Sequence, residues 1–346
     1  MLTDLPGVRF PLIQAPMAGV QGVDLALAVS AAGALGSLPC AMLGLEALRE
    51  SLARIQAVGA CVNINFFCHV PPTPDAAREA AWREALQPYY RAYGIEAAQQ
   101  VVPAPLRAPF SAEIADLLAH FRPAVVSFHF GLPSAELLAR VRAWGARVMS
   151  SATTLDEALW LQAHGVDAII AQGLEAGGHR GMFLTQDVST QVGTLALVRQ
   201  IVRAVRVPVI AAGGIADAAG VAAAMALGAA GVQVGTAYLL CPEATTGPRH
   251  RAALQSDAAR HTALTRVFSG RPARGIVNRL MRDFAADDRV VPAFPLAGAA
   301  LAPLRQAAEQ AGCDDFTPLW SGQNASGCSA VPAAQLTEAL ARGFDR

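Results

Sequence analysis

The chain has 346 residues, a formal net charge of zero and 53% hydrophobic residues. This length and composition allow one large domain with a sizeable core, or a large domain joined to a smaller one. The balance of 27 basic and 27 acidic side chains argues against a nucleic-acid or membrane-surface role driven by charge. All basic residues are Arg, and the absence of Lys excludes both Schiff-base chemistry and a P-loop lysine.

The cysteines and the hydropathy pattern indicate where the protein works. None of the six cysteines forms a C-x-x-C pair, so we expect buried thiols in a reducing cytoplasm and no metal site. No apolar run reaches the ~18 residues of a membrane span without a break. We therefore expect a cytoplasmic protein with no membrane segment and no nucleic-acid partner, while the sequence leaves the oligomeric state open.

Short apolar runs alternate with helical patterns along the first 240 residues. The runs that predict strands are 11–15, 35–37, 61–65, 124–128, 147–150, 168–171, 208–212 and 231–234. Seven helical patterns follow or separate them, with Ser134 and the Thr154/Glu157 pair as N-terminal caps. Eight strands with helical crossovers favour an α/β fold, a closed (β/α)₈ TIM barrel over 1–240. The alternative is an open doubly wound sheet, but no G-x-G-x-x-G follows the first strand.

The other parts of the chain do not fit the repeating pattern. Residues 66–110 are expected to be an inserted excursion with one helix at about 76–98. Residues 241–315 predict a small, mostly helical second domain, and residues 316–346 a tail that returns to the barrel.

The segment 171–181 carries the densest set of chemical signals. It follows an apolar strand and holds four glycines within nine residues, which permit positive φ and close approach of a ligand. Among them lie Glu175, His179 and Arg180. An imidazole in such a loop can act as base, acid or hydrogen-bond donor, so His179 is the candidate catalytic residue. Glu175 and Arg180 are expected to pair.

Polar and small residues recur where the predicted strands end, which is the active-site end of such barrels. The glycines and Thr236 after the last two strands offer backbone N–H groups suited to a phosphate. Gln172 and Gln233 either read the edge of a flavin ring or satisfy buried backbone groups. His69 and His129 are equally open to a structural role or a direct one. Phe66 and Phe67 either form a dry pocket or belong to the core.

Several segments together resemble the nitronate monooxygenases, formerly called 2-nitropropane dioxygenases, and the chain looks like their class I members. The segments are Gln14-Ala15-Pro16-Met17, Asn65-Phe-Phe-Cys-His69, Ser127-Phe-His-Phe-Gly131, the Gly173–Gly181 loop, Ala212-Gly213-Gly214, Gln233-Val-Gly235-Thr236 and Leu319-Trp-Ser-Gly-Gln-Asn324. Strand-end glycines alone are common to many barrels, whereas the Phe-Phe-Cys-His and Ser-Phe-His-Phe-Gly segments are specific. The resemblance covers nearly the whole chain.

The resemblance implies a flavoprotein that oxidises small nitronates with O₂. Propionate 3-nitronate, a toxic metabolite, is the implied substrate, and an oxo-acid or aldehyde plus nitrite are the implied products, formed by way of a flavin semiquinone. It implies His179 as the catalytic residue and Phe67, His69 and His129 as pocket residues. The residues implied to bind non-covalent FMN are Gln14, Ala15, Pro16, Met17, Asn65, Gln172, Gly177, Gly213, Gly214, Gln233, Gly235 and Thr236.

Two other interpretations compete with a nitronate monooxygenase. FMN-dependent NAD(P)H:quinone reductases and enoyl-ACP reductases resemble the same family and differ in oxidising a nicotinamide. A non-catalytic flavin- or phosphate-binding barrel is the other, since fold alone does not imply activity. The loop at 172–181 has no Cys, which argues against an IMP dehydrogenase-like enzyme.

Overall fold

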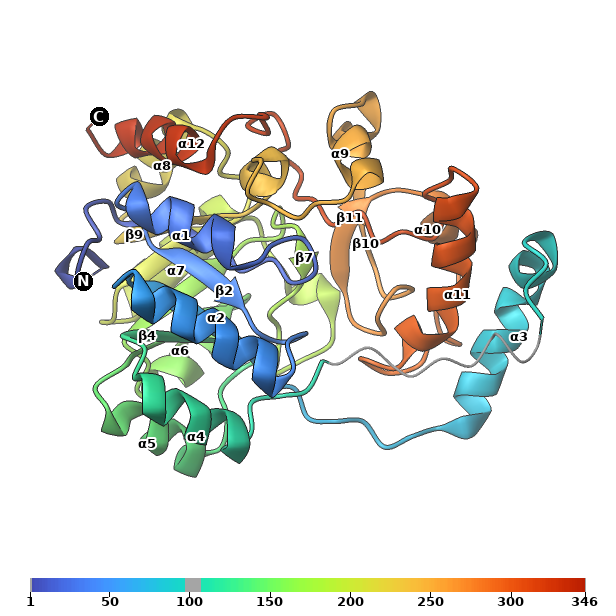
Figure 1. Ribbon diagram of the computed structural model, residues 1–346, viewed down its shortest axis with the longest axis horizontal. Coiled ribbons are helices and arrows are strands. Elements are labelled where there is room, and N and C mark those ends of the chain that lie inside the picture. The colour runs from blue at the N-terminus through green and yellow to red at the C-terminus, as the bar shows by residue number, and fades with distance from the viewer. Residues whose placement is uncertain (1, 97–106, 346) are drawn as a thin grey trace.

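The computed structural model describes residues 2–96 and 107–345, and its larger part is a closed parallel barrel (Figure 1). The strand order is β1-β9-β8-β6-β5-β4-β3-β2, and every neighbouring pair is parallel. The seam closes where Gln14 N–H donates to Leu35 O and Leu35 N–H donates to Leu12 O, both at 2.9 Å. The strands are β1 (Leu12–Gln14), β2 (Gly36–Pro39), β3 (Val62–Phe67), β4 (Val125–His129), β5 (Arg147–Ala152), β6 (Ala168–Gln172), β8 (Val209–Ala212) and β9 (Gly231–Val234). The predicted (β/α)₈ barrel is confirmed, and the open sheet is excluded.

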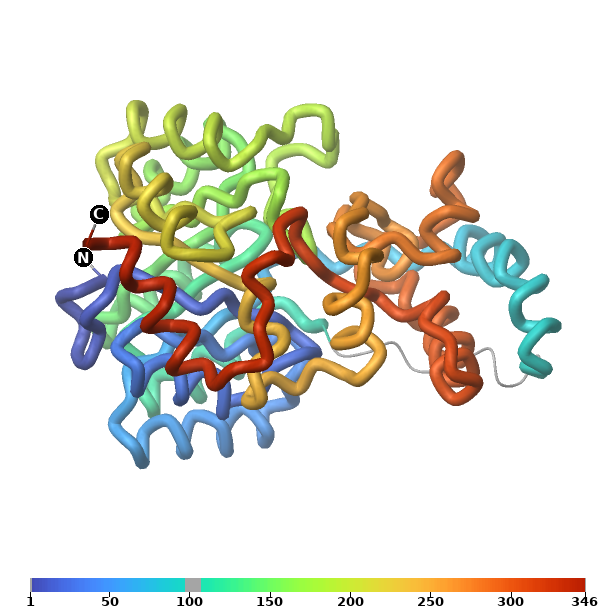
Figure 2. Tube along the Cα trace, turned by 90° about the horizontal axis from the view of Figure 1, so that it is seen from above, coloured from blue at the N-terminus to red at the C-terminus, as the bar shows by residue number. Residues whose placement is uncertain are grey.

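Helices surround the barrel, as the view from above shows (Figure 2). They are α1 (Val23–Ala31), α2 (Leu45–Ala57), α4 (Ala112–Phe121), α5 (Ala135–Ala143), α6 (Leu155–Ala163), α7 (Thr194–Ala204), α8 (Ala218–Ala226) and α12 (Ala333–Ala341). The last of these comes from the C-terminal segment and contacts α1 and α8. The chain therefore crosses to the second lobe after β9 and comes back to complete the ring.

The sequence explains why these elements form. All residues of β1, β2, β3, β6 and β8 are buried, as expected for strands covered on both faces. An apolar cluster that includes Ile13, Met149 and Ile210 contains side chains from several barrel strands. The predicted caps form as well, because the Ser134 and Thr154 hydroxyls accept from the N–H groups of Leu137 and Glu157.

A second lobe stands beside the carboxyl ends of the strands (Figure 1). It contains α9 (Pro248–Leu254), β10 (Thr262–Thr265), β11 (Ala273–Ile276), α10 (Arg279–Asp283) and α11 (Ala297–Gln310), and it also receives α3 (Ala76–Ala92). Short 3₁₀ helices complete the described chain: η1 (Leu2–Asp4), η3 (Val188–Thr190), η4 (Thr236–Leu240), η5 (Asp257–Arg260) and η6 (Arg342–Asp345).

The excursion after β3 is tied to this lobe by its helix α3. Trp82 Nε1–H donates to the carbonyl of Ala297 at 3.2 Å, and the Tyr90 hydroxyl donates to the carbonyl of Ala300 at 2.7 Å. The helix ends at Ala92, earlier than the expected end at about residue 98, because Gly94 takes a left-handed φ of 64°. Residues 97 and 98 lie outside the described residues. The lobe thus draws on two segments far apart in the sequence.

The lobe also contains a small antiparallel sheet that the helical patterns did not predict. In it β11 pairs with β10 on one side and with β7 (Gly178–His179) on the other. Because β7 belongs to the glycine loop after β6, this pairing draws His179 to the junction between barrel and lobe.

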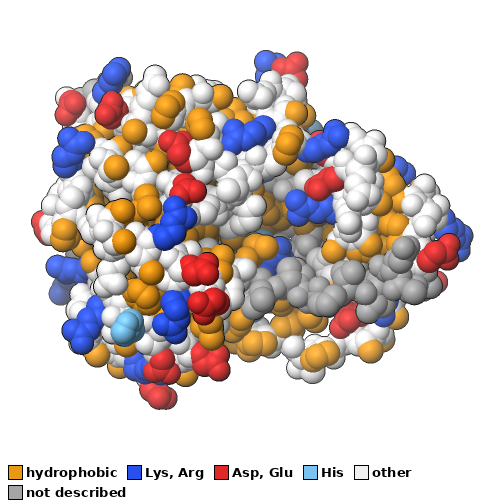
Figure 3. Space-filling model, viewed as in Figure 1, with side chains coloured by type: hydrophobic (Ala, Val, Ile, Leu, Met, Phe, Trp, Pro, Cys, Tyr) orange, Lys and Arg blue, Asp and Glu red, His pale blue; other side chains and the backbone are white. Residues whose placement is uncertain are grey.

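The outer surface carries no large single-sign field on the face shown in Figure 3, where acidic and basic side chains are interspersed. This pattern agrees with the zero net charge. No helix within 2–96 and 107–345 has the length and apolar character needed to cross a membrane.

Candidate active site

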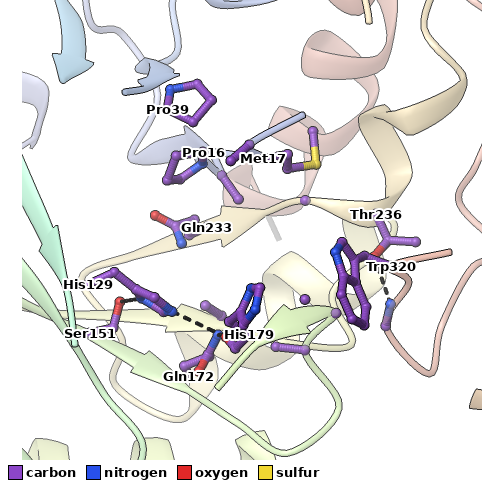
Figure 4. A pocket seen from close by; sticks show the side chains of 18 of the residues that line it. Pro16, Met17, Pro39, His129, Ser151, Gln172, His179, Gln233, Thr236 and Trp320 are labelled. Atoms are coloured by element: carbon purple, nitrogen blue, oxygen red, sulfur yellow. Dashed lines mark hydrogen bonds between the residues drawn. The ribbon is translucent and has the colours of Figure 1, made fainter. Parts of the chain in front are cut away.

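A large cavity opens at the carboxyl ends of the barrel strands, where barrel and lobe meet (Figure 4). Its empty space, counted together with the open mouth, is about 1370 Å³. The residues predicted from the sequence that line it are Ala15, Pro16, Met17, Asn65, Phe67, His129, Gln172, Gly177, His179, Gly213, Gly214, Gln233, Gly235 and Thr236. One cavity therefore brings together residues from the ends of six barrel strands or the loops that follow them.

Two predicted residues do not line this cavity, and the structure gives each a different environment. Gln14 is fully buried, with its amide donating to Gln21 Oε1 at 2.7 Å while its own Oε1 accepts from Ser37 N–H at 3.0 Å. Gln21 in turn accepts from Met17 N–H at 2.9 Å. Gln14 thus helps to fix the loop that carries Pro16 and Met17 into the cavity.

His69 does not line the cavity and packs instead in an aromatic cluster with Phe67, Phe130 and Phe294. Its ring is edge-on to Phe294 at 4.8 Å, and its buried Nδ1 has no hydrogen-bond partner. Burial, followed by the charges of Arg271 and Arg107, lowers the pKa of His69 to about 4. The ring is therefore neutral at physiological pH.

His179 is held from both its side chain and its main chain. Its Nε2 lies 2.8 Å from Ser269 Oγ, and its carbonyl accepts from Gln172 Nε2–H at 3.0 Å. Burial above all, and next the positive charge of Arg107, keeps the pKa of His179 well below its usual range. The candidate catalytic imidazole is thus neutral and fixed in place.

His129 lies beside His179 on the same wall of the cavity (Figure 4). Its Nδ1 is 3.0 Å from Ser151 Oγ and its Nε2 is 3.2 Å from the carbonyl oxygen of His179. Burial lowers the pKa of His129 to about 3, so this ring is also neutral. His129 therefore contacts the main chain of His179 and also lines the cavity, which is compatible with either of the roles that the sequence left open.

The glycine loop is held by polar contacts that differ from the expected Glu175–Arg180 pair. Arg180 is fully buried and donates instead to Gln191 Oε1 and to the carbonyls of Gln172 and Gly173. The Glu175 carboxylate accepts from the N–H and hydroxyl of Thr194, which begins α7. The two charged side chains therefore fix the loop from its two ends rather than neutralising each other.

The glycines around the cavity serve two different purposes. A Cβ on Gly177 would lie 2.5 Å from Gly322 N, so this glycine is required where the returning tail crosses the loop. Gly213 and Gly214 have φ of 116° and 72°, values that L side chains rarely adopt. The tail is pinned by Asn324 Nδ2–H donating to Gly214 O and by Gly322 N–H donating to Thr236 Oγ1. Exposed backbone and short polar side chains thus converge at one end of the cavity.

The amide side chains divide between structural and unassigned roles. Gln172 satisfies backbone groups, because it donates to His179 O and accepts from Gly181 N–H. Asn65 donates to Ser127 Oγ at 2.9 Å. Gln233 differs: its Oε1 is buried in the cavity wall and has no hydrogen-bond partner. A buried acceptor without a partner is costly, so Gln233 fits a ligand that donates a hydrogen bond.

Sequence reasoning missed several lining residues. They are Pro39, Met42, Arg107, Ser151, Trp320, Gly322 and Asn324. Ser151 escaped because β5 runs past residue 150, the predicted end of that strand. Trp320 and Asn324 belong to a segment noted only for its resemblance, and nothing local marks Arg107. For Phe66 and Phe67 the sequence left open a place in the core or in the pocket. Phe66 packs in the core against Phe110, and Phe67 lines the cavity.

These features together define a class of protein. A closed (β/α)₈ barrel with a deep cavity at the carboxyl strand ends, two neutral histidines and a backbone-lined polar end is the arrangement of a barrel enzyme.

The comparisons give the family. The sequence profile of the nitronate monooxygenase family matches residues 1–343, and the chain belongs to this family. Nitronate monooxygenases of Pseudomonas aeruginosa and Paraburkholderia phytofirmans are 42% and 43% identical, over 98% and 99% of this chain and 97% and 94% of theirs. The chain is accordingly an oxidoreductase.

Solved structures agree with this assignment. A nitroalkane oxidase from Streptomyces ansochromogenes superposes with a TM-score of 0.89 at 36% identity, covering 99% of this chain and 97% of the other. A variant of FabK from Thermotoga maritima superposes with a TM-score of 0.72 at 26% identity, covering 99% and 95%.

Proposed function

We propose that the protein is an FMN-dependent nitronate monooxygenase that oxidises small alkyl nitronates with O₂, propionate 3-nitronate being the implied physiological substrate. The observation that supports this proposal most strongly is the neutral, immobilised His179 in the wall of a cavity that also has a backbone-lined polar end. A nitronate is already a carbanion equivalent, so its oxidation needs no strong base.

The cavity residues fit a flavin mononucleotide. Gly213, Gly214, Gly235 and Thr236 would hold the phosphate, and Gln233 would accept a hydrogen bond from the ring system through its unpaired Oε1. Ala15, Pro16, Met17, Asn65, Gln172 and Gly177 would flank the flavin. Bound FMN supplies the one-electron chemistry between nitronate and O₂. In overall balance, two nitronates and one O₂ give two carbonyl compounds and two nitrite ions.

The contacts of Ser269 indicate which nitrogen of the neutral His179 ring carries the hydrogen. The Ser269 hydroxyl lies 3.3 Å from Arg271 O and 3.4 Å from Arg271 N, besides its 2.8 Å contact with His179 Nε2. A hydroxyl has one hydrogen and two lone pairs. All three contacts are satisfied when the hydroxyl donates to Arg271 O and accepts from Arg271 N–H and from His179 Nε2–H.

This tautomer gives His179 a free lone pair on Nδ1. A neutral imidazole with a free Nδ1 can take the α-proton of a neutral nitroalkane, and burial keeps it from being protonated by solvent beforehand. With an anionic nitronate, which has no such proton to lose, the same residue only positions the substrate. Phe67 and Phe130 are buried near its ring and keep water away.

The test is the visible spectrum of the purified protein, recorded without oxygen before and after propionate 3-nitronate is added. Bleaching of a bound flavin by the nitronate, followed by nitrite release when air is admitted, is the expected result. A bound flavin that ignores the nitronate but is reduced by NADH or NADPH would favour the reductase alternative. A colourless protein that FMN does not reconstitute would overturn the cofactor assignment.

A further inference from the structure

Arg107 is the one side chain with a formal charge among the described residues that line the cavity. It lies near the end of the excursion, in a segment anchored to the end of β3, because Phe110 N–H donates to Phe67 O at 2.8 Å. The same short segment packs through the Phe110 ring against Phe66 at 5.0 Å. The anchored segment therefore places Arg107 at the mouth of the barrel.

The guanidinium of Arg107 has an apolar setting and no anionic partner in the described part of the chain. Its carbon lies 5.8 Å over the Phe294 ring, and its buried Nη1 has no hydrogen-bond partner. Burial, together with the nearby Arg305, lowers the pKa of Arg107 from its usual value. Residues 97–106, outside the described part, contain no Asp or Glu that would neutralise it. A buried guanidinium without a counter-ion is costly unless a ligand provides one.

The charged side chain of Arg107 lies close to the candidate catalytic residue His179. Arg107 and His179 both lie within 6 Å of the Phe294 ring centre, by 5.8 Å and 5.4 Å. Arg107 is also the charged group that most lowers the pKa of His179. A short molecule therefore reaches both residues, and no carboxylate of the described lining competes for the cation.

We propose that Arg107 is a specificity-determining residue that binds a carboxylate carried on the alkyl chain of the nitronate substrate. The inference rests on the proposed function and assigns this second anionic group to a particular side chain. A guanidinium matches a carboxylate in geometry and forms charge-assisted hydrogen bonds with it. An uncharged alkyl chain leaves the cation unpaired, so the site discriminates by charge at the chain end remote from the nitro group.

The kinetic test compares two substrates of equal carbon number. Propionate 3-nitronate and propyl-1-nitronate differ only in a carboxylate that replaces a methyl group. Arg107→Gln should lower kcat/KM for the first by about 10- to 100-fold, mainly through KM, and for the second by less than about threefold. Arg107→Lys should restore part of the loss. Equal losses on both substrates would overturn the proposal.

A charge control and a binding measurement separate this inference from the proposed function. Arg305→Gln removes a neighbouring positive charge from the half-exposed face of α11 and should leave the ratio between the two substrates unchanged. Calorimetric titration with succinate and butyrate, which place a planar carboxylate where the nitro group would be, needs no turnover. Arg107→Gln should weaken succinate at least tenfold and spare butyrate. An unchanged succinate affinity would refute the role of Arg107 even if the enzyme oxidised no nitronate.

Discussion

The Nε2 of His129 lies 3.2 Å from the main-chain oxygen of His179, and this contact determines which nitrogen of the His129 ring carries the hydrogen. A carbonyl oxygen only accepts, so His129 Nε2 must carry the hydrogen. The pKa of His129 is lowered to about 3, so the ring is neutral and its Nδ1 accepts from the Ser151 hydroxyl at 3.0 Å. A chain of two hydrogen bonds thus runs from β5 through β4 to the glycine loop.

Breaking this pair of hydrogen bonds should impair catalysis without loss of the bound flavin. We expect His129→Phe to lower kcat/KM for nitronates by about tenfold, because one of the two donors that hold the His179 carbonyl is lost. Flavin content, measured by absorbance, should be unchanged. Ser151→Ala breaks only the outer contact and should cost less. Full activity in His129→Phe would show that Gln172 alone positions His179.

His179 should matter differently for neutral and anionic substrates. His179→Asn should reduce turnover of neutral nitroethane by about 10²- to 10⁴-fold, the usual contribution of a positioned base. Turnover of ethyl nitronate, which has already lost that proton, should fall by less than about tenfold. The measurement is steady-state oxygen uptake with each form added freshly. Equal losses for both forms would contradict proton transfer by His179.

Ser269 provides the matching control for the tautomer. Ser269→Ala removes the acceptor of His179 Nε2–H and should reproduce part of the nitroethane defect, whereas Ser269→Thr keeps the hydroxyl and should restore activity. If Ser269→Ala behaves like the unmodified protein towards nitroethane, the free lone pair on Nδ1 is not set by this contact.

Much of the barrel was predictable because its signals are local. The apolar runs and caps predict the β9 strand at its observed bounds and the start of α5 at Ser134. Strand ends were less predictable: β3 includes Phe66 and Phe67, and β5 reaches Ala152. In each case pairing with a neighbouring strand, rather than local pattern, extends the element.

The site was predictable where residues follow the strands and unpredictable where distant segments meet. Arg107 and Trp320 enter the cavity from the excursion and the tail, and β7 forms only because β11 lies against it. No periodicity within the glycine loop predicts a strand of two residues. Likewise the carbonyl partners of Arg180 depend on the folded loop, so charge alone wrongly favoured Glu175.

Acid should destabilise the fold through its buried histidines. The pKa values of His69 and His250 are lowered to about 4 and that of His129 to about 3, against about 6.5 in an unfolded chain. Below pH ~6.5 the unfolded chain takes up protons that the folded protein excludes, so their contribution is full above that pH and is lost as pH falls towards 4. Urea unfolding should show a falling free energy of unfolding across this window.

A single substitution isolates one of these protons. His250 Nε2 lies 3.0 Å from the carbonyl of Trp320, and Gln can still donate to that oxygen. His250→Gln should therefore reduce the slope of unfolding free energy against pH between pH 6 and 4.5. The reduction should correspond to the uptake of about one proton fewer on unfolding. An unchanged slope would mean that carboxylates, which titrate lower, account for the acid sensitivity.

The backbone at Gly214 should distinguish phosphate binding from ring binding. Gly214 has φ of 72°, and a Cβ there would lie 3.4 Å from the Glu175 side chain at the polar end of the cavity. We expect Gly214→Ala to weaken FMN binding at least tenfold, because strain displaces the backbone that would hold the phosphate, while riboflavin, which lacks the phosphate, binds as before. Fluorescence quenching of each flavin gives the two dissociation constants. Gly59→Ala imposes the same positive-φ strain, at 64° and in open space, and should leave both constants unchanged. A parallel loss of FMN and riboflavin affinity in Gly214→Ala would place the phosphate elsewhere.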